Sequence, residues 1–321
     1  MRAFFYEAFE EEREALRKSL PQGCEPGFTE RTVQESGHQA PPCRLISVRT
    51  QSEIPASWAP ALEGVLSRST GFDRLRSWRR QVAPAPACGY LPRYCALAVA
   101  EHALLVWLAL LRKLPRQTDQ FRRFHRDGLT GRECAGRRLL VIGVGNIGYE
   151  AVRLGAALQM NVFGADLVRR HGDVRYTDAA EGLRQADVIV CAMNLTEENA
   201  GYFSYARLRE LRPGAIFVNV ARGEMAPAAD LLRAYDEGIL GGIGLDVYDR
   251  ESELAVCLRE SRAPADPGGQ ALLELARRPN VILTPHNAFN TQESVERKSR
   301  QSAEQVVHFL DQGRFLWPVP D

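Results

Sequence analysis

Leu139-Leu140-Val141-Ile142-Gly143-Val144-Gly145-Asn146-Ile147-Gly148 is the stretch that decides the fold of this chain. Four apolar residues of strand length run into a Gly-x-Gly-x-x-Gly turn, and a stretch with helical spacing follows at 149–158. The first glycine of such a turn allows a tight bend, the second lets backbone N–H groups approach a pyrophosphate, and the third lets helix and strand pack closely. The stretch therefore predicts a β-turn-α unit that binds a dinucleotide.

An acidic residue stands where this unit requires one. The fingerprint expects a carboxylate about 20 residues after the glycines, placed to accept a hydrogen bond from a ribose hydroxyl. Asp166 lies 18 residues after Gly148, at the end of the apolar run 162–165. We expect a cofactor site formed by Gly143, Gly145, Asn146, Ile147, Gly148 and Asp166. The charge of Asp166 would repel a 2′-phosphate and favours NAD; Arg169 and Arg170 could flank such a phosphate and keep NADP as the alternative.

Apolar runs of strand length alternate with helical stretches on both sides of the fingerprint. In the C-terminal direction the runs lie at 162–165, 188–190, 216–218, 243–245 and 281–283. Strands that are apolar throughout and separated by helices indicate a doubly wound parallel sheet of the Rossmann type. In the N-terminal direction, strands at 3–6, 44–49 and 64–67, a helix at 8–20 and a loop at 21–42 predict a smaller α/β domain ending near residue 95. The apolar helix 96–111 forms the junction, and an amphipathic helix at 293–310 could return to the first domain.

Composition and length exclude several classes of protein. A length of 321 residues suggests about two domains, and 45% apolar with 25% charged residues argues against disorder. The net charge of +1 excludes a globally basic surface for nucleic acid or lipid. The seven scattered cysteines form no C-x-x-C pair, which argues against a zinc cluster or a disulfide framework and fits a reducing cytoplasm. The longest apolar run has nine residues, too short to span a membrane, and the acidic N-terminus does not fit a signal peptide.

Polar signals follow three of the predicted strands after the fingerprint. They are Asn219-Val220-Ala221-Arg222-Gly223, Asp246-Val247-Tyr248-Asp249-Arg250-Glu251 and Thr284-Pro285-His286-Asn287-Ala288-Phe289. The carboxyl ends of parallel strands face the ligand crevice, so an arginine, a carboxylate and a histidine could meet beside a nicotinamide. Taken singly, Arg222, Glu251 and His286 could be a surface ion pair, a loop acid and a turn residue; their joint placement is what favours catalysis.

These motifs closely resemble the D-isomer-specific 2-hydroxyacid dehydrogenase family, and its D-lactate dehydrogenase branch in particular. The resemblance covers nearly the whole chain and includes the motifs Phe5-Tyr6-Glu7-Ala8-Phe9-Glu10-Glu11, Ser69-Thr70-Gly71-Phe72-Asp73, Leu91-Pro92-Arg93-Tyr94 and Val99-Ala100-Glu101-His102. It implies a flavodoxin-like substrate domain built from both chain ends, at 1–98 and 291–321, around an NAD-binding Rossmann domain at 99–290. It also implies a homodimer, without nucleic acid, membrane or metal partners.

The resemblance also implies roles for single residues. His286 would be the general acid that protonates the carbonyl oxygen, with Glu251 supporting its protonated form and Arg222 binding the carboxylate of a 2-oxo acid. Asp246 would receive the nicotinamide carboxamide, and Asn194 would lie in the cofactor loop. Substrate contacts would come from Arg49, Ser69, Thr70, Gly71, Tyr94, Arg222 and Phe289.

Departures from the family pattern and the choice of substrate leave alternatives open. Asn194 and Ser252 stand where the family usually has proline, and the stretch 254–269 is longer than usual. Tyr94 and Phe289 suit a small side chain, as in pyruvate and D-lactate, whereas Arg49 could point to glyoxylate, hydroxypyruvate or a larger 2-oxo acid. Two other classes stay open: an NAD-sensing regulator of the same fold, and nucleic-acid binding by the basic stretch 112–126.

Overall fold

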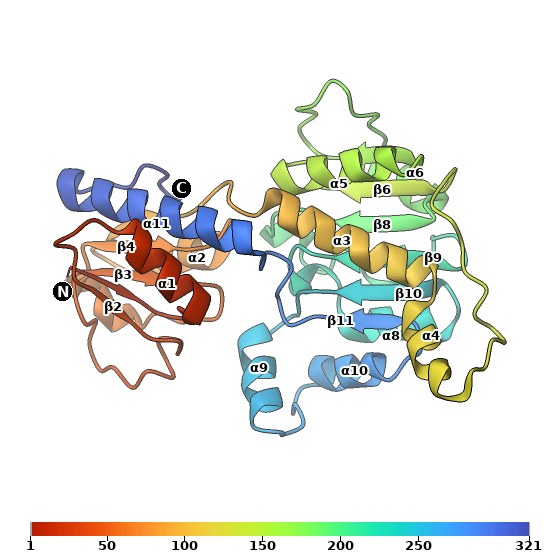
Figure 1. Ribbon diagram of the computed structural model, residues 1–321, viewed down its shortest axis with the longest axis horizontal. Coiled ribbons are helices and arrows are strands. Elements are labelled where there is room, and N and C mark those ends of the chain that lie inside the picture. The colour runs from red at the N-terminus through yellow and green to blue at the C-terminus, as the bar shows by residue number, and fades with distance from the viewer. Residues whose placement is uncertain (1, 321) are drawn as a thin grey trace. The chain divides into compact units, whose positions relative to one another are not determined.

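The computed structural model describes residues 2–320, which fold into two compact units (Figure 1). Both chain ends build the first unit, Met1–Cys95 with Asn290–Asp321, and the second unit is Ala96–Phe289. Each unit contains its own parallel sheet, and all the strands of both sheets pair in parallel. The predicted class, two α/β folds with doubly wound parallel sheets, is therefore confirmed.

The first unit has a five-stranded sheet in the flavodoxin-like order β2-β1-β3-β4-β5. Its strands are β1 (Ala3–Phe5), β2 (Pro26–Phe28), β3 (Leu45–Val48), β4 (Gly64–Ser67) and β5 (Ala87–Gly89). The prediction of a continuous loop at 21–42 was wrong, because β2 lies within it and pairs with β1. Its Pro-Gly-Phe sequence has no strand signal, but proline is tolerated at the edge of a sheet, where no neighbour needs its N–H.

Helices from both chain ends pack together in the first unit. Helix α1 (Glu10–Ser19) contacts the long helix α11 (Gln292–Gln312), and the remaining helices are η1 (Ala56–Ala61) and α2 (Asp73–Gln81). Helix α11 ends at Gly313, whose φ of +68° is the left-handed conformation that commonly terminates a helix. This contact confirms that the C-terminal helix returns to the fold of the N-terminal residues.

A fully buried ion cluster ties these segments to the sheet of the first unit. Glu12 Oε1 accepts a 2.8 Å hydrogen bond from Arg68 Nε and lies 3.0 Å from Lys298 Nζ, and all three side chains are inaccessible to solvent. Burial alone would raise the pKa of Glu12, but the charges of Arg68 and Lys298 lower that pKa to about 2. The cluster joins α1, the end of β4 and α11, so folding of this unit depends on both chain ends.

The second unit has a six-stranded sheet in the order β11-β10-β9-β8-β6-β7. Its strands are β6 (Arg138–Ile142), β7 (Asn161–Ala165), β8 (Val188–Cys191), β9 (Ala215–Asn219), β10 (Leu240–Leu245) and β11 (Val281–Leu283). The chain runs from β6 outward to β7 and then returns to place β8 on the other side of β6. In open parallel sheets such a reversal opens a crevice beyond the carboxyl ends of the strands, where ligands bind.

Helices surround this second sheet. Helix α3 (Ala96–Leu111), predicted at this position, contacts α5 (Asn146–Ala157), β9 and β10 (Figure 1). The others are α4 (Leu114–Gln120), η2 (Phe121–Arg123), α6 (Ala179–Gln185), η3 (Glu197–Asn199), α7 (Tyr205–Leu208), η4 (Gly223–Met225), α8 (Ala228–Asp236), α9 (Glu251–Arg259) and α10 (Pro267–Ala276). Throughout residues 2–320, each helix is too short or too polar to span a lipid bilayer.

Candidate active site

The glycine-rich turn connects β6 to α5 at the crevice, and its three glycines have different surroundings. Gly143 has a φ of +89°, and a Cβ added there would lie 2.6 Å from the backbone of Met193, in the loop after β8. A Cβ on Gly148 would lie 1.9 Å from the carbonyl oxygen of Gly143. Gly145, in contrast, faces open space with no atom within 4 Å of an added Cβ. Two glycines therefore permit the packing of the turn, and the third leaves room for a ligand.

Asp166 braces the same turn. Its Oδ2 accepts a 2.6 Å hydrogen bond from the N–H of Val144, and its Oδ1 accepts a 2.9 Å hydrogen bond from the N–H of Val168. Each carboxylate oxygen retains a further lone pair for a hydroxyl donor. Asn146 and Ile147 form the first turn of α5, where helix N–H groups lack partners within the helix and attract phosphate. The open Gly145 position, the helix N-terminus and the carboxylate together fit a dinucleotide.

The loop after β8 is ordered without the proline that the family usually has at position 194. Asn199 Nδ2 donates a 2.8 Å hydrogen bond to the carbonyl oxygen of Asn194, and Asn199 Oδ1 accepts one of 2.8 Å from the N–H of Thr196. The side chain of Thr196 completes a capping box at η3. The Asn199 side chain therefore fixes the loop that a proline ring would otherwise stiffen.

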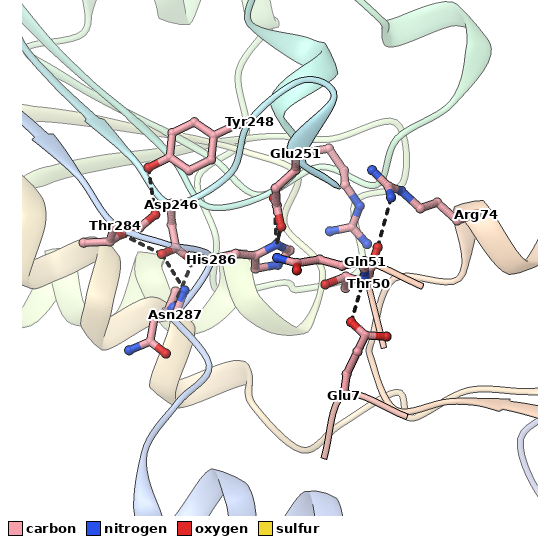
Figure 2. Close-up of polar contacts among 12 residues, drawn as sticks. Glu7, Thr50, Gln51, Arg74, Asp246, Tyr248, Glu251, Thr284, His286 and Asn287 are labelled. Carbon is pink, nitrogen blue, oxygen red and sulfur yellow. Dashed lines mark hydrogen bonds and ion pairs between the residues drawn. The ribbon is translucent and has the colours of Figure 1, made fainter. Parts of the chain in front are cut away.

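His286 and Glu251 face each other in the candidate active site (Figure 2). The Nδ1 atom of His286 lies 2.8 Å from Oε1 and 2.9 Å from Oε2 of Glu251. An ionised carboxylate only accepts hydrogen bonds, so Nδ1 carries a proton and Nε2 is the nitrogen left for a substrate. The His286 side chain is 19% exposed and that of Glu251 is 11% exposed, so the pair is shielded from water but accessible to a ligand.

Asp246 holds the turn on which His286 lies (Figure 2). Its Oδ1 accepts hydrogen bonds from the Thr284 hydroxyl at 2.6 Å and the Asn287 N–H at 2.8 Å, and its Oδ2 accepts one from the Ala288 N–H at 2.9 Å. His286 itself has a φ of +51°, an unfavourable conformation for a residue with a side chain. The nearly buried carboxylate of Asp246 therefore offsets strain in the backbone that presents the imidazole.

Three residues with no role assigned from the sequence support this turn. The hydroxyl oxygen of Tyr248 lies within hydrogen-bond distance of two carbonyl oxygens, that of Thr284 at 2.7 Å and that of Leu245 at 3.1 Å. His102 Nε2 lies 3.1 Å from the Thr284 hydroxyl oxygen. Since the single hydroxyl proton of Thr284 is donated to Asp246, His102 donates from Nε2. The motifs around positions 102, 248 and 284 are visible in the sequence, but only the structure shows that these side chains converge.

Glu251 is the first residue of α9, so its negative charge lies at the positive end of a helix. Ser252 follows it without breaking the helix, and Arg250 before it has a φ of +50°. The long stretch at 254–269 supplies most of α9 and the start of α10, and the Asp266 side chain caps α10 by accepting from the N–H of Gly269 at 2.8 Å. Residues 260–266 connect these two helices, and α10 packs against α8.

Arg222 lies directly after β9, where the strand ends at Asn219. The Asn219 side chain fixes this loop, because it donates to the carbonyl oxygen of Arg222 at 2.9 Å and accepts from the N–H of Ala221 at 3.0 Å. Arg222 Nη1 donates to the carbonyl oxygen of Ala221 at 2.7 Å. The guanidinium of Arg222 is thus held at the carboxyl edge of the sheet. Phe289, which was also predicted from the sequence to contact the substrate, is the last residue of the second unit, and its side chain is buried.

The other predicted substrate residues lie at carboxyl ends of strands in the first unit. Arg49 follows β3; Ser69, Thr70 and Gly71 follow β4; and the buried Tyr94 comes after β5. Ser69 Oγ donates to the carbonyl oxygen of Gly71 at 2.6 Å, which shapes that loop.

Glu7, given no role from the sequence, holds the loop after β3. Its carboxylate accepts from the N–H group of Gln51 at 3.0 Å (Figure 2). It also accepts from the N–H groups of Arg49 at 2.8 Å and Ser52 at 3.2 Å. Arg74 Nη1 donates to the carbonyl oxygen of Thr50 in the same loop at 3.0 Å. The backbone of this loop is therefore fixed at four points, and Arg49 is presented from a rigid segment.

The chain matches a known protein family over more than half of its length. Residues 104–288 match the model of the D-isomer specific 2-hydroxyacid dehydrogenase NAD binding domain. The chain belongs to the D-isomer-specific 2-hydroxyacid dehydrogenase family. As a member, it is an NAD-dependent oxidoreductase that acts on the CH–OH group of D-2-hydroxy acids.

Relatives within the family lie at moderate sequence identity. The D-2-hydroxyacid dehydrogenase (NAD+) of Lacticaseibacillus paracasei is 30% identical over 229 residues, which are 70% of this chain and 68% of the relative. A D-lactate dehydrogenase of Streptococcus agalactiae is 27% identical over 230 residues, 70% of this chain and 69% of the relative. The crystal structure of the Aquifex aeolicus D-lactate dehydrogenase complexed with NAD and lactic acid superposes with a TM-score of 0.85 over 100% of both chains, at 27% identity. The dehydrogenase fold therefore extends over the whole chain.

Proposed function

We propose that this dehydrogenase reduces a small 2-oxo acid to the D-2-hydroxy acid, with pyruvate as the preferred substrate and D-lactate as its product. The observation that carries the proposal is the Glu251–His286 pair, in which one ring nitrogen is bound by a carboxylate and the other is left for a carbonyl oxygen. Relatives named as D-lactate dehydrogenases support the choice of pyruvate.

The residues would divide the reaction among them in the following way. Bound NADH supplies the hydride. The Arg222 guanidinium binds the carboxylate of the 2-oxo acid, because its planar fork matches the two oxygens. His286 donates a proton from Nε2 to the carbonyl oxygen, and Glu251 stabilises the imidazolium before that transfer. In the oxidative direction His286 takes the hydroxyl proton back. Asp246, which holds the His286 turn, would also receive the nicotinamide carboxamide, and Asn194 would lie in the cofactor loop.

The proposed substrate contacts also include residues that were predicted in the first unit. Backbone N–H groups of Thr70 and Gly71, in the loop shaped by Ser69, would bind the substrate carboxylate. Tyr94 and Phe289 would supply an apolar wall suited to a methyl group. Arg49 keeps open the alternative of a distal hydroxyl or charge, as in hydroxypyruvate, or of glyoxylate or a larger 2-oxo acid. Its Cζ lies 5.5 Å from the centre of the Phe9 ring, an arrangement that holds the guanidinium against an aromatic face.

The preferred cofactor in this proposal is NAD rather than NADP. Asp166 carries its negative charge at the end of β7, where the 2′-phosphate of NADP would approach it. Arg169, which could otherwise flank such a phosphate, packs against an aromatic ring: its Cζ lies 5.8 Å from the centre of the Tyr176 ring. A direct comparison of NADH and NADPH turnover tests this preference.

A homodimer and a cytoplasmic location complete the proposal. Exposed apolar side chains on α3, α4 and the following segment of the second unit would be covered in a dimer: Leu97, Leu105, Leu114, Phe121 and Phe124. The cytoplasmic assignment is supported by the seven cysteines, all of which are free thiols.

The test of the function is NADH oxidation at 340 nm with pyruvate, hydroxypyruvate, glyoxylate, phenylpyruvate and 2-oxoisocaproate, repeated with NADPH. We expect turnover with NADH and the highest kcat/KM for pyruvate. Tight NADH binding without turnover of any of these substrates would refute the proposal and favour an NAD-sensing regulator of the same fold.

A further inference from the structure

A concave site lies at the amino-terminal edge of the six-stranded sheet. It encloses about 330 Å³ and is lined by Arg132, Arg137, Ala186, Asp187, Arg212, Pro213 and Ala215. These residues precede the strands: Arg137 comes directly before β6, Asp187 directly before β8, and Arg212 shortly before β9. The glycine turn and Arg222, in contrast, follow β6 and β9. The two sites therefore lie at opposite edges of one parallel sheet.

The charges in this site do not balance. Three of the seven lining residues are arginines, and one is an acid. Arg137 Nη1 and Arg212 Nη1 lie 3.9 Å and 3.7 Å from the same oxygen, Asp187 Oδ1. These distances allow attraction but are too long for hydrogen bonds. Two guanidinium groups thus share one carboxylate oxygen without donating to it.

The carboxylate of Asp187 is already committed to the backbone. Its Oδ2 accepts a 2.9 Å hydrogen bond from the N–H of Arg138, and its side chain is 12% exposed. Arg132 also lines the site, and its Nη1 donates to the carbonyl oxygen of Gly214 at 3.4 Å. The Arg137 and Arg212 side chains are 40% and 54% exposed. Guanidinium donors from three segments of the chain can therefore turn toward a ligand in the site.

We propose that this arginine site binds a small polyvalent phosphate anion, either inorganic or a phosphate ester. Guanidinium groups pair with phosphate through two parallel N–H···O hydrogen bonds, and a phosphate group has enough oxygens for several such pairs. A monovalent anion would leave the excess positive charge uncompensated. The site is separate from the cofactor site and does not depend on the substrate proposed for the enzyme.

Inorganic pyrophosphate titrated into the full-length protein by calorimetry tests the proposal. The titration is done with saturating NADH, so that the cofactor edge of the sheet is occupied, and at constant ionic strength. We expect Arg212→Gln and Arg137→Gln each to weaken pyrophosphate binding by about 10-fold or more. Arg184→Gln is the matched control: its side chain is also 54% exposed and 3.4 Å from an acid, Glu210, but it does not line the site. That variant should change the affinity less than about 2-fold.

A second variant reverses the sign of the effect. Asp187→Asn removes the acid but keeps an acceptor oxygen for the N–H of Arg138, so pyrophosphate should bind several-fold more tightly to it. Absence of binding to the wild type, or equal affinity in Arg212→Gln and the wild type, would overturn the assignment. A change in oligomer mass in Arg212→Gln, measured by light scattering, without an effect on pyrophosphate affinity would overturn it in favour of a contact between copies of the chain.

Discussion

Replacing Glu251 by glutamine tests the central pair of the proposed mechanism with little change in shape. Glutamine keeps one oxygen that can accept from His286 Nδ1, which now lies 2.8 Å from Oε1, but it carries no charge to stabilise an imidazolium. A hydrogen bond to a charged group contributes about 1.5–3 kcal/mol and a neutral one about 0.5–1.5 kcal/mol. The difference of about 1–2 kcal/mol corresponds to about a 5- to 30-fold loss. We expect kcat for pyruvate reduction to fall by that factor.

The assay is NADH oxidation at 340 nm under saturating pyruvate, with NADH affinity measured separately by fluorescence. Glu253→Gln is the matched control, because Glu253 lies two residues further along α9, is 60% exposed and pairs with Arg250 rather than with the imidazole. NADH affinity should stay within about 2-fold of the wild type in both variants. An unchanged kcat in Glu251→Gln, or an equal loss in Glu253→Gln, would show that the carboxylate does not act through His286.

The remaining predictions concern proton transfer, the cofactor turn and the buried ion cluster. His286→Ala should lower kcat by about 10²- to 10⁴-fold and leave NADH binding nearly intact, as single-turnover and binding measurements can show. Gly145→Val should weaken NADH binding at least about 10-fold with little change in Tm, since the added side chain enters open space, whereas Gly148→Val should destabilise the fold. Glu12 has a folded-state pKa of about 2, below the ordinary 4.5, so its contribution to stability is complete above pH 4.5 and is lost as the pH falls toward 2. Urea unfolding should therefore show stability falling over this pH range, and Glu12→Gln should reduce that dependence while costing about 3–5 kcal/mol near neutral pH.

Much of the fold could be predicted because its signals are local. The strands of the second unit are apolar on both faces, and the glycine turn requires a strand before it and a helix after it, so 139–148 was identifiable without any partner. Helix α3 was likewise visible as an apolar run of helical length. Strand β2 was not, because three residues that include proline and glycine gain their strand conformation only by pairing with β1. Its stability depends on contacts distant in sequence.

The candidate site was predicted in its chemical groups but not in its supporting contacts. The residue types and their strand-end positions suggested that His286 and Glu251 meet, and the structure brings Nδ1 within 2.9 Å of both carboxylate oxygens. The network beneath them was not predicted. Tyr248 and His102 reach Thr284 from segments about 36 and 182 residues away in sequence, and no periodicity records such contacts. Glu7 likewise acts through backbone N–H groups more than 40 positions along the chain.

The acids at the two carboxyl edges share one physical logic. Asp166 accepts from two backbone N–H groups, Asp246 from two N–H groups and a hydroxyl, and Glu7 from three N–H groups. Each carboxylate therefore fixes the loop that carries a functional group: the glycine turn, the His286 turn and the Arg49 loop. A carboxylate suits this task because it only accepts hydrogen bonds, whereas an amide of the same shape would point an N–H donor at a backbone donor. These carboxylates therefore fix the backbone of their loops. The positions of the charged groups that a ligand meets depend on the loops being fixed in this way.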